Sequence, residues 1–231
     1  MAGAPGPLPQ RDFSDFTFRT LPSGDLSHAD ISLVMTLFEE NYREANRPYL
    51  ERSLGTLKYT TIAEHRGVPA AFALGEARVM DLPRLPRQPV TLAGICCVSP
   101  RFRRRGLFGE VEMRSLRAAQ LAFTGRFLAC GRMAHPASFR VMMRNTSVVP
   151  RPGLTPSDWH QAVGTAIAAA YGVPEFDPLT FVCKGTGHPI GYPIMEIDAT
   201  EEEWALFRCV DRSRGDSLLG ISWSPDPPER W

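Results

Sequence analysis

The sequence predicts an α/β protein, because segments with strand-like and helix-like periodicity follow one another along most of its 231 residues. Hydrophobic residues make up 43% of the chain and charged residues 22%, which supplies enough apolar surface for a core and excludes a wholly disordered chain. The length fits one large domain, or a domain of about 150 residues with a substantial extension. No internal repeat is visible.

The charge balance and the cysteines exclude several classes of protein. With 26 Lys and Arg against 25 Asp and Glu, the net charge of +1 argues against broad electrostatic capture of nucleic acid. The five cysteines, at positions 96, 97, 130, 183 and 209, form no CxxC pair. We therefore expect free thiols in a reducing compartment and no metal site. No secretory signal and no run of 18 apolar residues is present, so we expect a cytoplasmic protein that does not enter a membrane.

The first elements follow from caps and periodicity. Residues 1–14 are rich in Pro and Gly and are predicted to form a disordered tail. Residues 16–20 alternate like a strand. Ser27 and Asp30 then form a capping box at the start of a helix. The apolar positions of that helix are Ile31, Val34, Met35, Phe38 and Tyr42. A second helical stretch is predicted at 48–57.

The middle of the chain predicts a hairpin and a buried strand. Residues 59–65 and 68–82 alternate around the turn Arg66-Gly67, as in an antiparallel hairpin. The segment 83–89 carries three prolines, so we expect a loop that continues neither strand. Residues 90–98 are nearly all apolar or small, which is typical of a central strand buried on both faces. A helix at 107–123, a strand at 126–133 and a helix at 136–144 follow.

A composition break at 150–156 suggests a boundary between a domain at 15–149 and a C-terminal α/β extension at 150–231. Thr155-Pro156 is predicted to open a helix that Gly172 ends. The inward residues of this helix are Trp159, Val163, Ile167 and Ala170. Strands are predicted at 180–183, 193–197 and 218–223, and a capping box from Thr200 to Glu203 opens a further helix.

Residues 98–109, VSPRFRRRGLFG, carry the most informative chemistry. A buried strand runs into a turn that opens a helix, so successive backbone amides there lack intrahelical partners at the positive end of the helix dipole. Such a turn binds phosphate, and Gly106 allows a ligand to approach the backbone closely. Arg103, Arg104 and Arg105 add donors for anionic oxygens. The segment is neither a Walker loop nor the dinucleotide pattern GxGxxG.

This segment resembles motif A of the GCN5-related N-acetyltransferases, the GNAT superfamily. That pattern is Arg/Gln-x-x-Gly-x-Gly/Ala after an apolar strand that ends Val-x-Pro-x-Tyr. The matching or nearly matching residues are Val98, Pro100, Phe102, Arg103 and Gly106, while Phe108 replaces the final small residue. The order of elements agrees from residue 16 to about 147. The resemblance implies a GNAT-like mixed central β-sheet flanked by helices, with the C-terminal α/β extension packed on it.

The resemblance also implies an activity: transfer of an acyl group, most simply acetyl from acetyl-CoA or another acyl-CoA, to a small-molecule amine by direct attack in a ternary complex. Backbone amides from Arg104 to Phe108 would hold the pyrophosphate, and Cys96 and Val98 would pair with the pantetheine arm. An amide near Cys97 or Val98 would polarise the thioester carbonyl. The implied cofactor-binding residues are Cys96, Cys97, Val98, Arg103, Arg104, Arg105, Gly106, Leu107, Phe108 and Ser138.

The chain departs from the family pattern where a general acid is expected. Relatives often have Asn-Pro-x-Ser-x-x-x-Tyr, in which the Tyr protonates the departing thiolate. Here His135 replaces the Asn, Ser138 matches, and Met142 replaces the Tyr. A thioether cannot donate a proton. The thiolate could leave unassisted, given an ordinary thiol pKa of about 8.5, or His135 or a residue of the extension could serve instead.

A base must accept the proton of the attacking ammonium, directly or through water. Glu76 is the first candidate by analogy and Glu64 the second, although each also fits a surface strand position. Glu110 and Glu112 suit the helix dipole. Cys96 and Cys97 should face opposite sides of their strand with no activating His, which disfavours an acyl-cysteine mechanism.

Two alternative functions remain open at this point. A longer acyl-CoA could use Met142 and Met143 in place of the missing acid. Alternatively, a GNAT-like module could bind CoA, or no ligand, and act as a regulator or partner. The acceptor is expected to be a small molecule, because the extension could close one side of a pocket, and a homodimer is possible.

Overall fold

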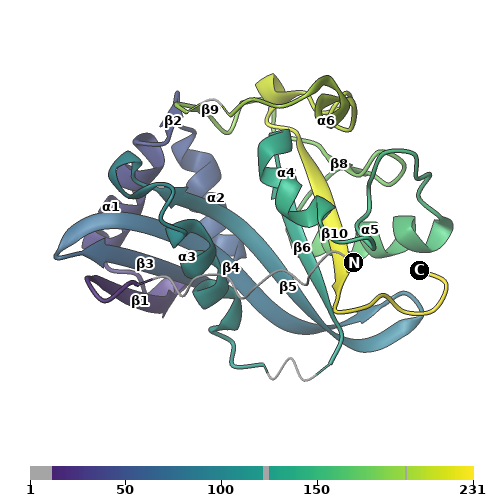
Figure 1. Ribbon diagram of the computed structural model, residues 1–231, viewed down its shortest axis with the longest axis horizontal. Helices are drawn as coiled ribbons and strands as arrows, with labels where there is room; N and C mark the ends of the chain where they lie inside the picture. Colours follow the sequence, from purple (N-terminus) through teal and green to yellow (C-terminus); the bar gives the residue numbers. More distant parts are fainter. Residues whose placement is uncertain (1–11, 122–124, 196) are drawn as a thin grey trace, which may run out of the picture.

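A computed structural model describes residues 12–121, 125–195 and 197–231, so most of the tail predicted at 1–14 lies outside the described residues. Within that tail, Phe13 packs edge-on against Phe16 and Phe18, with ring centroids 5.8 and 6.0 Å apart. The fold is α/β, as predicted, and is built on one eight-stranded sheet (Figure 1).

The sheet has the strand order β1-β3-β4-β5-β6-β10-β8-β7. Its neighbours pair antiparallel except β5 and β6, which are parallel, so the sheet is mixed. The strands are β1 (Phe16–Pro22), β3 (Tyr59–His65), β4 (Val68–Leu82), β5 (Leu85–Val98), β6 (Phe127–Met133), β7 (Phe176–Asp177), β8 (Val182–Cys183) and β10 (Ser217–Ser224). The short strands β2 (Tyr42–Arg43) and β9 (Tyr192–Pro193) pair separately.

Helices cover both faces of this sheet. They are α1 (His28–Glu39), α2 (Arg47–Thr56), α3 (Leu107–Arg117), α4 (Pro136–Met143), α5 (Asp158–Ala170) and α6 (Glu201–Ala205), with short 3-10 turns at Ser23–Asp25, Pro100–Phe102 and Arg212–Arg214. In Figure 1, α3 and α4 lie in front of the sheet and α1 and α2 behind it. The capping boxes predicted at Ser27 and Thr200 both form, because each side chain accepts from the third helical amide.

Several predicted boundaries are wrong. The first helix ends at Glu39, before Tyr42, and the strand predicted at 193–197 is reduced to Tyr192–Pro193. The segment 83–89 is not a long loop, because β5 already starts at Leu85, which pairs with Leu82 across a tight turn. The prolines are tolerated there because β5 pairs with β6 only from Val90 onward, so this end of the strand has a partner on one side only. The helix predicted to run to residue 123 ends at Arg117, and a turn with Gln120 at a φ of 51° follows.

The C-terminal residues complete the central sheet. β10 pairs with β6 over seven residues, from Leu218 opposite Met133 to Ser224 opposite Phe127. β8 and β7 then extend the same sheet outward. The predicted extension therefore shares its sheet with the rest of the chain.

The two faces of β4 differ in side-chain size. Phe72 and Leu74 point toward α1 and α2 and join the main apolar cluster. Ala71 and Ala73 point toward α3 and pack with Val111 in a second cluster. These small side chains let α3 lie close to the sheet: a Cβ on Gly75 would come within 2.6 Å of Ser115 Oγ.

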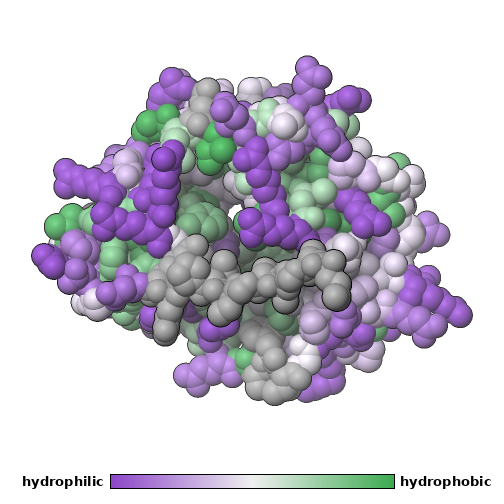
Figure 2. Space-filling view, viewed as in Figure 1, coloured by the Kyte–Doolittle hydropathy of each residue, from purple (hydrophilic) through white to green (hydrophobic). Residues whose placement is uncertain are grey.

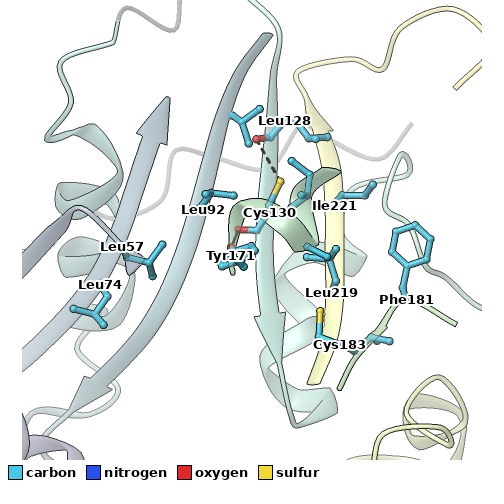
Figure 3. Packing of buried hydrophobic residues seen from close by; sticks show 14 of the residues in the cluster. Leu57, Leu74, Leu92, Leu128, Cys130, Tyr171, Phe181, Cys183, Leu219 and Ile221 are labelled. Carbon is cyan, nitrogen blue, oxygen red and sulfur yellow. Dashed lines mark hydrogen bonds between the residues drawn. The ribbon is translucent and has the colours of Figure 1, made fainter. Parts of the chain in front are cut away.

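A tyrosine marks the place where β5 and β6 separate. Tyr171, just after α5, is 7% exposed, and its hydroxyl lies 2.8 Å from the carbonyl oxygen of Ala93 and 3.0 Å from that of Cys130. Figure 3 shows Tyr171 beside Cys130 between the diverging ribbons. The single hydroxyl proton is therefore shared between two carbonyls in the last two pairs of the parallel strands, Leu92–Cys130 and Ala93–Gly131.

Replacing this phenol tests how much the junction contributes to stability. Tyr171→Phe should lower the free energy of unfolding by about 1–3 kcal/mol, because the one buried proton donor that the two carbonyls share is lost. Urea denaturation with an unchanged m-value measures the loss. Tyr49→Phe is the matched control, since no hydrogen bond to its hydroxyl is found in the described part of the chain. Equal stability of the two variants would contradict this role for Tyr171.

Candidate functional site

The site begins where β5 parts from β6. The two strands form four parallel pairs, from Val90–Leu128 to Ala93–Gly131, and then separate, although β5 continues to Val98. A β-bulge in β5 causes the separation. From the pair Gly75–Ala93 to the pair Ala73–Cys96, β4 advances two residues while β5 advances three. A bulge bends its strand and increases the local twist.

Gly94 is required at this bulge. A Cβ at this position would lie 2.2 Å from Leu57 Cδ1 and 3.0 Å from the backbone oxygen of Leu74. The extra residue also shifts the alternation of side chains, so that Leu92 and Cys97 face the main cluster while Cys96 faces α3. The prediction that Cys96 and Cys97 point to opposite faces is confirmed.

The backbone beyond the bulge faces the space between the strands. The amide of Ser99 donates to the Ala70 carbonyl on β4 at 2.8 Å. Because the backbone groups of successive strand residues point to alternate sides, those of Val98 and Cys96 point away from β4. Arg103 supports this direction, since its Nε donates to the Val98 carbonyl at 3.3 Å.

The turn after β5 presents the start of α3. Arg104 and Gly106 have positive φ values of 62° and 83°, and Gly106 is the N-cap residue without a side-chain cap. The first amides of α3 therefore have no side chain to accept from them, at the positive end of the helix dipole. Phe102 anchors the turn in the apolar cluster below α3, and the Arg105 guanidinium lies 5.7 Å from its ring centroid.

A cavity of about 440 Å³ joins these features. It includes eight of the twelve predicted site residues: Cys96, Cys97, Val98, Arg103, Arg104, Gly106, Leu107 and Phe108. Its other lining residues are Asn41, Tyr42, Phe102, Pro193 and Met195. In Figure 2 the surface is hollowed near the middle of the view, where Figure 1 places the divergence of β5 and β6.

Four of those other lining residues were missed by the sequence analysis: Asn41, Tyr42, Pro193 and Met195. They come from two segments that only β2 and β9 bring together, where Tyr42 pairs with Pro193. Asn41 Oδ1 accepts from Arg103 Nη2 at 2.9 Å, which ties the basic turn to the end of α1. Burial raises the pKa of Tyr42 well above its usual value, so its phenol stays protonated at neutral pH. No local motif signals these residues.

The other predicted site residues lie outside the cavity lining. Glu76 is on β4 opposite Leu92, 9% exposed, with Arg78 Nε 3.5 Å from its carboxylate. Arg105 and Ser138 are exposed. His135 caps α4, because its Nδ1 accepts from the Ala137 amide at 3.1 Å, and its ring meets Trp204 edge-on.

The helix position of Met142 shows a packing role. An added Cβ on Gly220 of β10 would lie 2.6 Å from its Sδ, and one on Gly131 of β6 would lie 3.9 Å away. The thioether therefore fills the space above two neighbouring glycines. Because a thioether has no proton to donate, Met142 cannot act as a general acid.

The acids of α3 differ from one another. Glu110 lies in the first turn and pairs with Arg114 at 2.7 Å, as the helix dipole predicts. Glu112 lies farther along the helix, beyond its first turn, and is half-buried next to the sheet-facing Val111, so the dipole explanation is wrong for it. Burial raises the pKa of Glu112 to about 7.

The comparisons with known proteins were made against families, curated sequences and solved structures. No family model matches the chain, and no curated protein sequence matches it. The ribosomal-protein-S18-alanine N-acetyltransferase of Escherichia coli is similar in structure at 10% identity and a TM-score of 0.44, over 93% of this chain and 99% of that chain.

Two further similar structures are also acetyltransferases. The GNAT family N-acetyltransferase YhbS from Escherichia coli, in complex with CoA, has 14% identity and a TM-score of 0.40, over 55% of this chain and 67% of that chain. An aminoglycoside acetyltransferase from an uncultured soil sample has 15% identity and a TM-score of 0.32, over 45% of this chain and 68% of that chain.

Within residues 12–121, 125–195 and 197–231, no helix is long and apolar enough to cross a membrane. The same part of the chain holds no group of three or more His, Cys, Asp or Glu side chains arranged to bind a metal ion.

The cysteine environments predict which thiols react. Burial raises the pKa of the Cys96, Cys97 and Cys130 thiols, whereas Cys209 is exposed. Iodoacetamide at pH 8 should therefore modify Cys209 first in the native protein. Acetyl-CoA should leave no acetyl group on Cys96 or Cys97.

Mass spectrometry of peptides, with Cys209→Ser as the control, checks both statements. An acetyl group found on Cys96 or Cys97 during turnover would contradict direct attack by the amine.

Proposed function

We propose that this chain is a GNAT-type N-acyltransferase that transfers an acyl group, most simply acetyl, from acyl-CoA to the amine of a small molecule. One observation carries the proposal. The backbone of Cys96 and Val98, released from β6 by the bulge, faces a cavity that ends at the uncapped start of α3.

The two halves of the cavity fit the two halves of CoA. The pantetheine arm contains amides, so it can pair with the exposed β5 backbone as an added strand would. The pyrophosphate fits the amides from Arg104 to Phe108, at the positive end of α3. Arg104 lines the cavity and can add charge-assisted contacts, whereas Arg103 already donates to Asn41 and to the Val98 carbonyl.

Catalysis would rest on placement and on carbonyl polarisation. Pairing along β5 would bring the thioester to Cys96, where an outward backbone amide can donate to the carbonyl oxygen as negative charge develops. The amine then attacks the carbonyl carbon, the C–N bond forms and the C–S bond breaks. Holding both reactants in one complex supplies the entropic part of the rate enhancement.

Glu76 is proposed as the base that takes the ammonium proton through water. It lies opposite Leu92, one position before the last β5–β6 pair at Ala93. Its side chain shares the sheet face of α1 and α2 rather than that of α3. This placement would separate an acceptor on one face from CoA on the other.

A second candidate function rests on Met142. The Met142 thioether packs over Gly131 and Gly220 and has no proton to donate, so α4 lacks the acid that the family resemblance implies. A CoA-binding module without turnover would fit that observation, and so would an enzyme for a longer acyl chain. Thiol release distinguishes them, because a binding module holds CoA but frees no thiol from its ester.

The first experiment is thermal unfolding with acetyl-CoA, desulfo-CoA and NAD. A ligand at 100 times its dissociation constant stabilises a protein by about 2.7 kcal/mol. We expect stabilisation by both CoA compounds and none by NAD, followed by thiol release when a suitable amine is added. No shift with saturating CoA would overturn the proposal.

Gly106→Glu tests the phosphate turn. The new carboxylate would repel the pyrophosphate, so the shift with desulfo-CoA should disappear. The unliganded protein should lose only about 1–2 kcal/mol, the cost of a side chain at positive φ. Gly67→Glu is the matched control, because Gly67 has a φ of 79° in the β3–β4 turn and open space around it. CoA binding by the Gly106 variant equal to that of the control would remove the turn from the site.

Glu76→Gln tests the base. We expect kcat to fall about 10²-fold and the rise of kcat with pH to change, because the amide cannot accept a proton. Glu51→Gln, an exposed acid on α2, serves as the control. An unchanged pH profile of kcat would exclude Glu76 from this role.

A further inference from the structure

One flank of α3 carries a half-buried carboxyl group, that of Glu112. Leu107, Val111 and Ser115 are buried against the sheet. Phe108 and Glu112 follow one another, one turn apart, along one flank of α3. Arg114 lies on the opposite flank, where its guanidinium is 4.0 Å from the centroid of the Phe18 ring of β1. Phe108 lines the cavity, and its carbonyl lies 3.7 Å from Cys96 Sγ. Glu112 is therefore one turn deeper along the flank that follows β5.

The position of Phe108 sets the level of Glu112 along the divergence, because Glu112 follows Phe108 by one turn of α3. Its charge acts on the Cys96 thiol on β5 and on the Tyr171 phenol. Tyr171 lies against the last two β5–β6 pairs, Leu92–Cys130 and Ala93–Gly131, and Cys96 lies three residues beyond Ala93. Glu112 consequently faces the stretch of β5 between the junction and the proposed thioester site at Cys96.

The surroundings of this carboxyl group are otherwise uncharged. Toward α3, β4 presents Ala71, Ala73 and Gly75. No hydrogen bond or ion pair to the Glu112 carboxyl is found among the described residues. Burial alone therefore raises its pKa to about 7, which leaves a large protonated fraction at neutral pH. On β6, the Arg132 guanidinium lies 5.9 Å from the Tyr171 ring centroid.

We propose that Glu112 is the general acid of the reaction and protonates the departing CoA thiolate, in place of the tyrosine that Met142 replaces. The inference rests on the proposed function, because the thioester position follows from CoA pairing with β5. It concerns a residue that the family pattern does not assign to this role.

The proton and electron balance is complete. The amine attacks the carbonyl carbon, and the C–S electron pair leaves with sulfur. The neutral carboxyl of Glu112 gives its proton to that sulfur, so free CoA thiol and a Glu112 carboxylate result. The carboxylate then regains a proton through water, equivalent to the one that the attacking amine releases.

Tyr42 is the rival donor. Its phenol is protonated and lines the cavity near Cys97, but it lies on the sheet face of the main apolar cluster, with its ring tilted by 44° against that of Phe38 at a centroid distance of 4.9 Å. The two donors differ in pH dependence. An acid with a pKa of about 7 loses activity as the pH rises through 7, whereas a phenol with a strongly raised pKa does not.

The test measures thiol release from acetyl-CoA with hydroxylamine as the amine, since hydroxylamine is already an uncharged nucleophile at neutral pH. In the unchanged chain, kcat should fall as the pH rises through about 7. Glu112→Gln should lower kcat at pH 6.5 by about 10²-fold and abolish this fall. Glu110→Gln, on the same helix, should change neither quantity, and stabilisation by desulfo-CoA should be equal in all three proteins.

A second measurement reports proximity without turnover. The absorbance of bound CoA thiolate, against a desulfo-CoA blank, gives the thiol pKa. A carboxylate beside the sulfur raises that pKa, so Glu112→Gln should lower it while Glu110→Gln leaves it unchanged.

The outcomes separate the inference from the proposed function. Turnover by Glu112→Gln with the fall above pH 7 retained, or with an unchanged thiol pKa, overturns the role of Glu112 and leaves the transferase standing. Loss of turnover in Tyr42→Phe alone assigns the acid to Tyr42. A protein that is not stabilised by CoA, or that binds it without releasing thiol, overturns the transferase and the acid together.

Discussion

The bulge at Gly94 is the constraint on which the site depends. One extra residue in β5 ends its pairing with β6, exchanges the faces of the following side chains and turns the backbone of Cys96 and Val98 toward open space. Leu57 and Leu74 close over Gly94, so the bulge cannot accept a side chain without displacing them. Tyr171 then shares its one hydroxyl proton between the carbonyls of Ala93 and Cys130 at the junction.

The two faces of the sheet differ in what they can offer a ligand. On the α3 face, small residues on β4 admit the helix closely, and the basic turn supplies amides and guanidinium groups for an anion. On the α1 face, the cavity wall is Asn41, Tyr42, Pro193 and Met195, which carry no charge. This division fits a nucleotide on one side and a second reactant on the other, joined through the gap that the bulge opens.

Much of the architecture could be predicted from local signals. The β3–β4 hairpin, the capping boxes at Ser27 and Thr200 and the glycine-containing turn that opens α3 all follow from short sequence patterns. The prediction of a loop at 83–89 is wrong because prolines are tolerated where a strand pairs on one side only. The sequence does not show that residues 85–89 pair with β4 but not with β6. The position of Glu112 near the start of α3 predicts an interaction with the helix dipole. That position does not show which flank of the helix lies along β5.

The sequence by itself determined the α/β class, the basic turn at Arg103–Gly106 and the lack of a proton donor at Met142, because each depends on residue types at short spacing. Only the tertiary structure decided that β10 completes the sheet beside β6 and that Pro193 and Met195 join Tyr42 at the cavity. It also placed the half-buried carboxyl group of Glu112 one helical turn beyond Phe108, whose carbonyl lies 3.7 Å from Cys96 Sγ. These features depend on contacts between residues far apart in the chain, which no local pattern encodes.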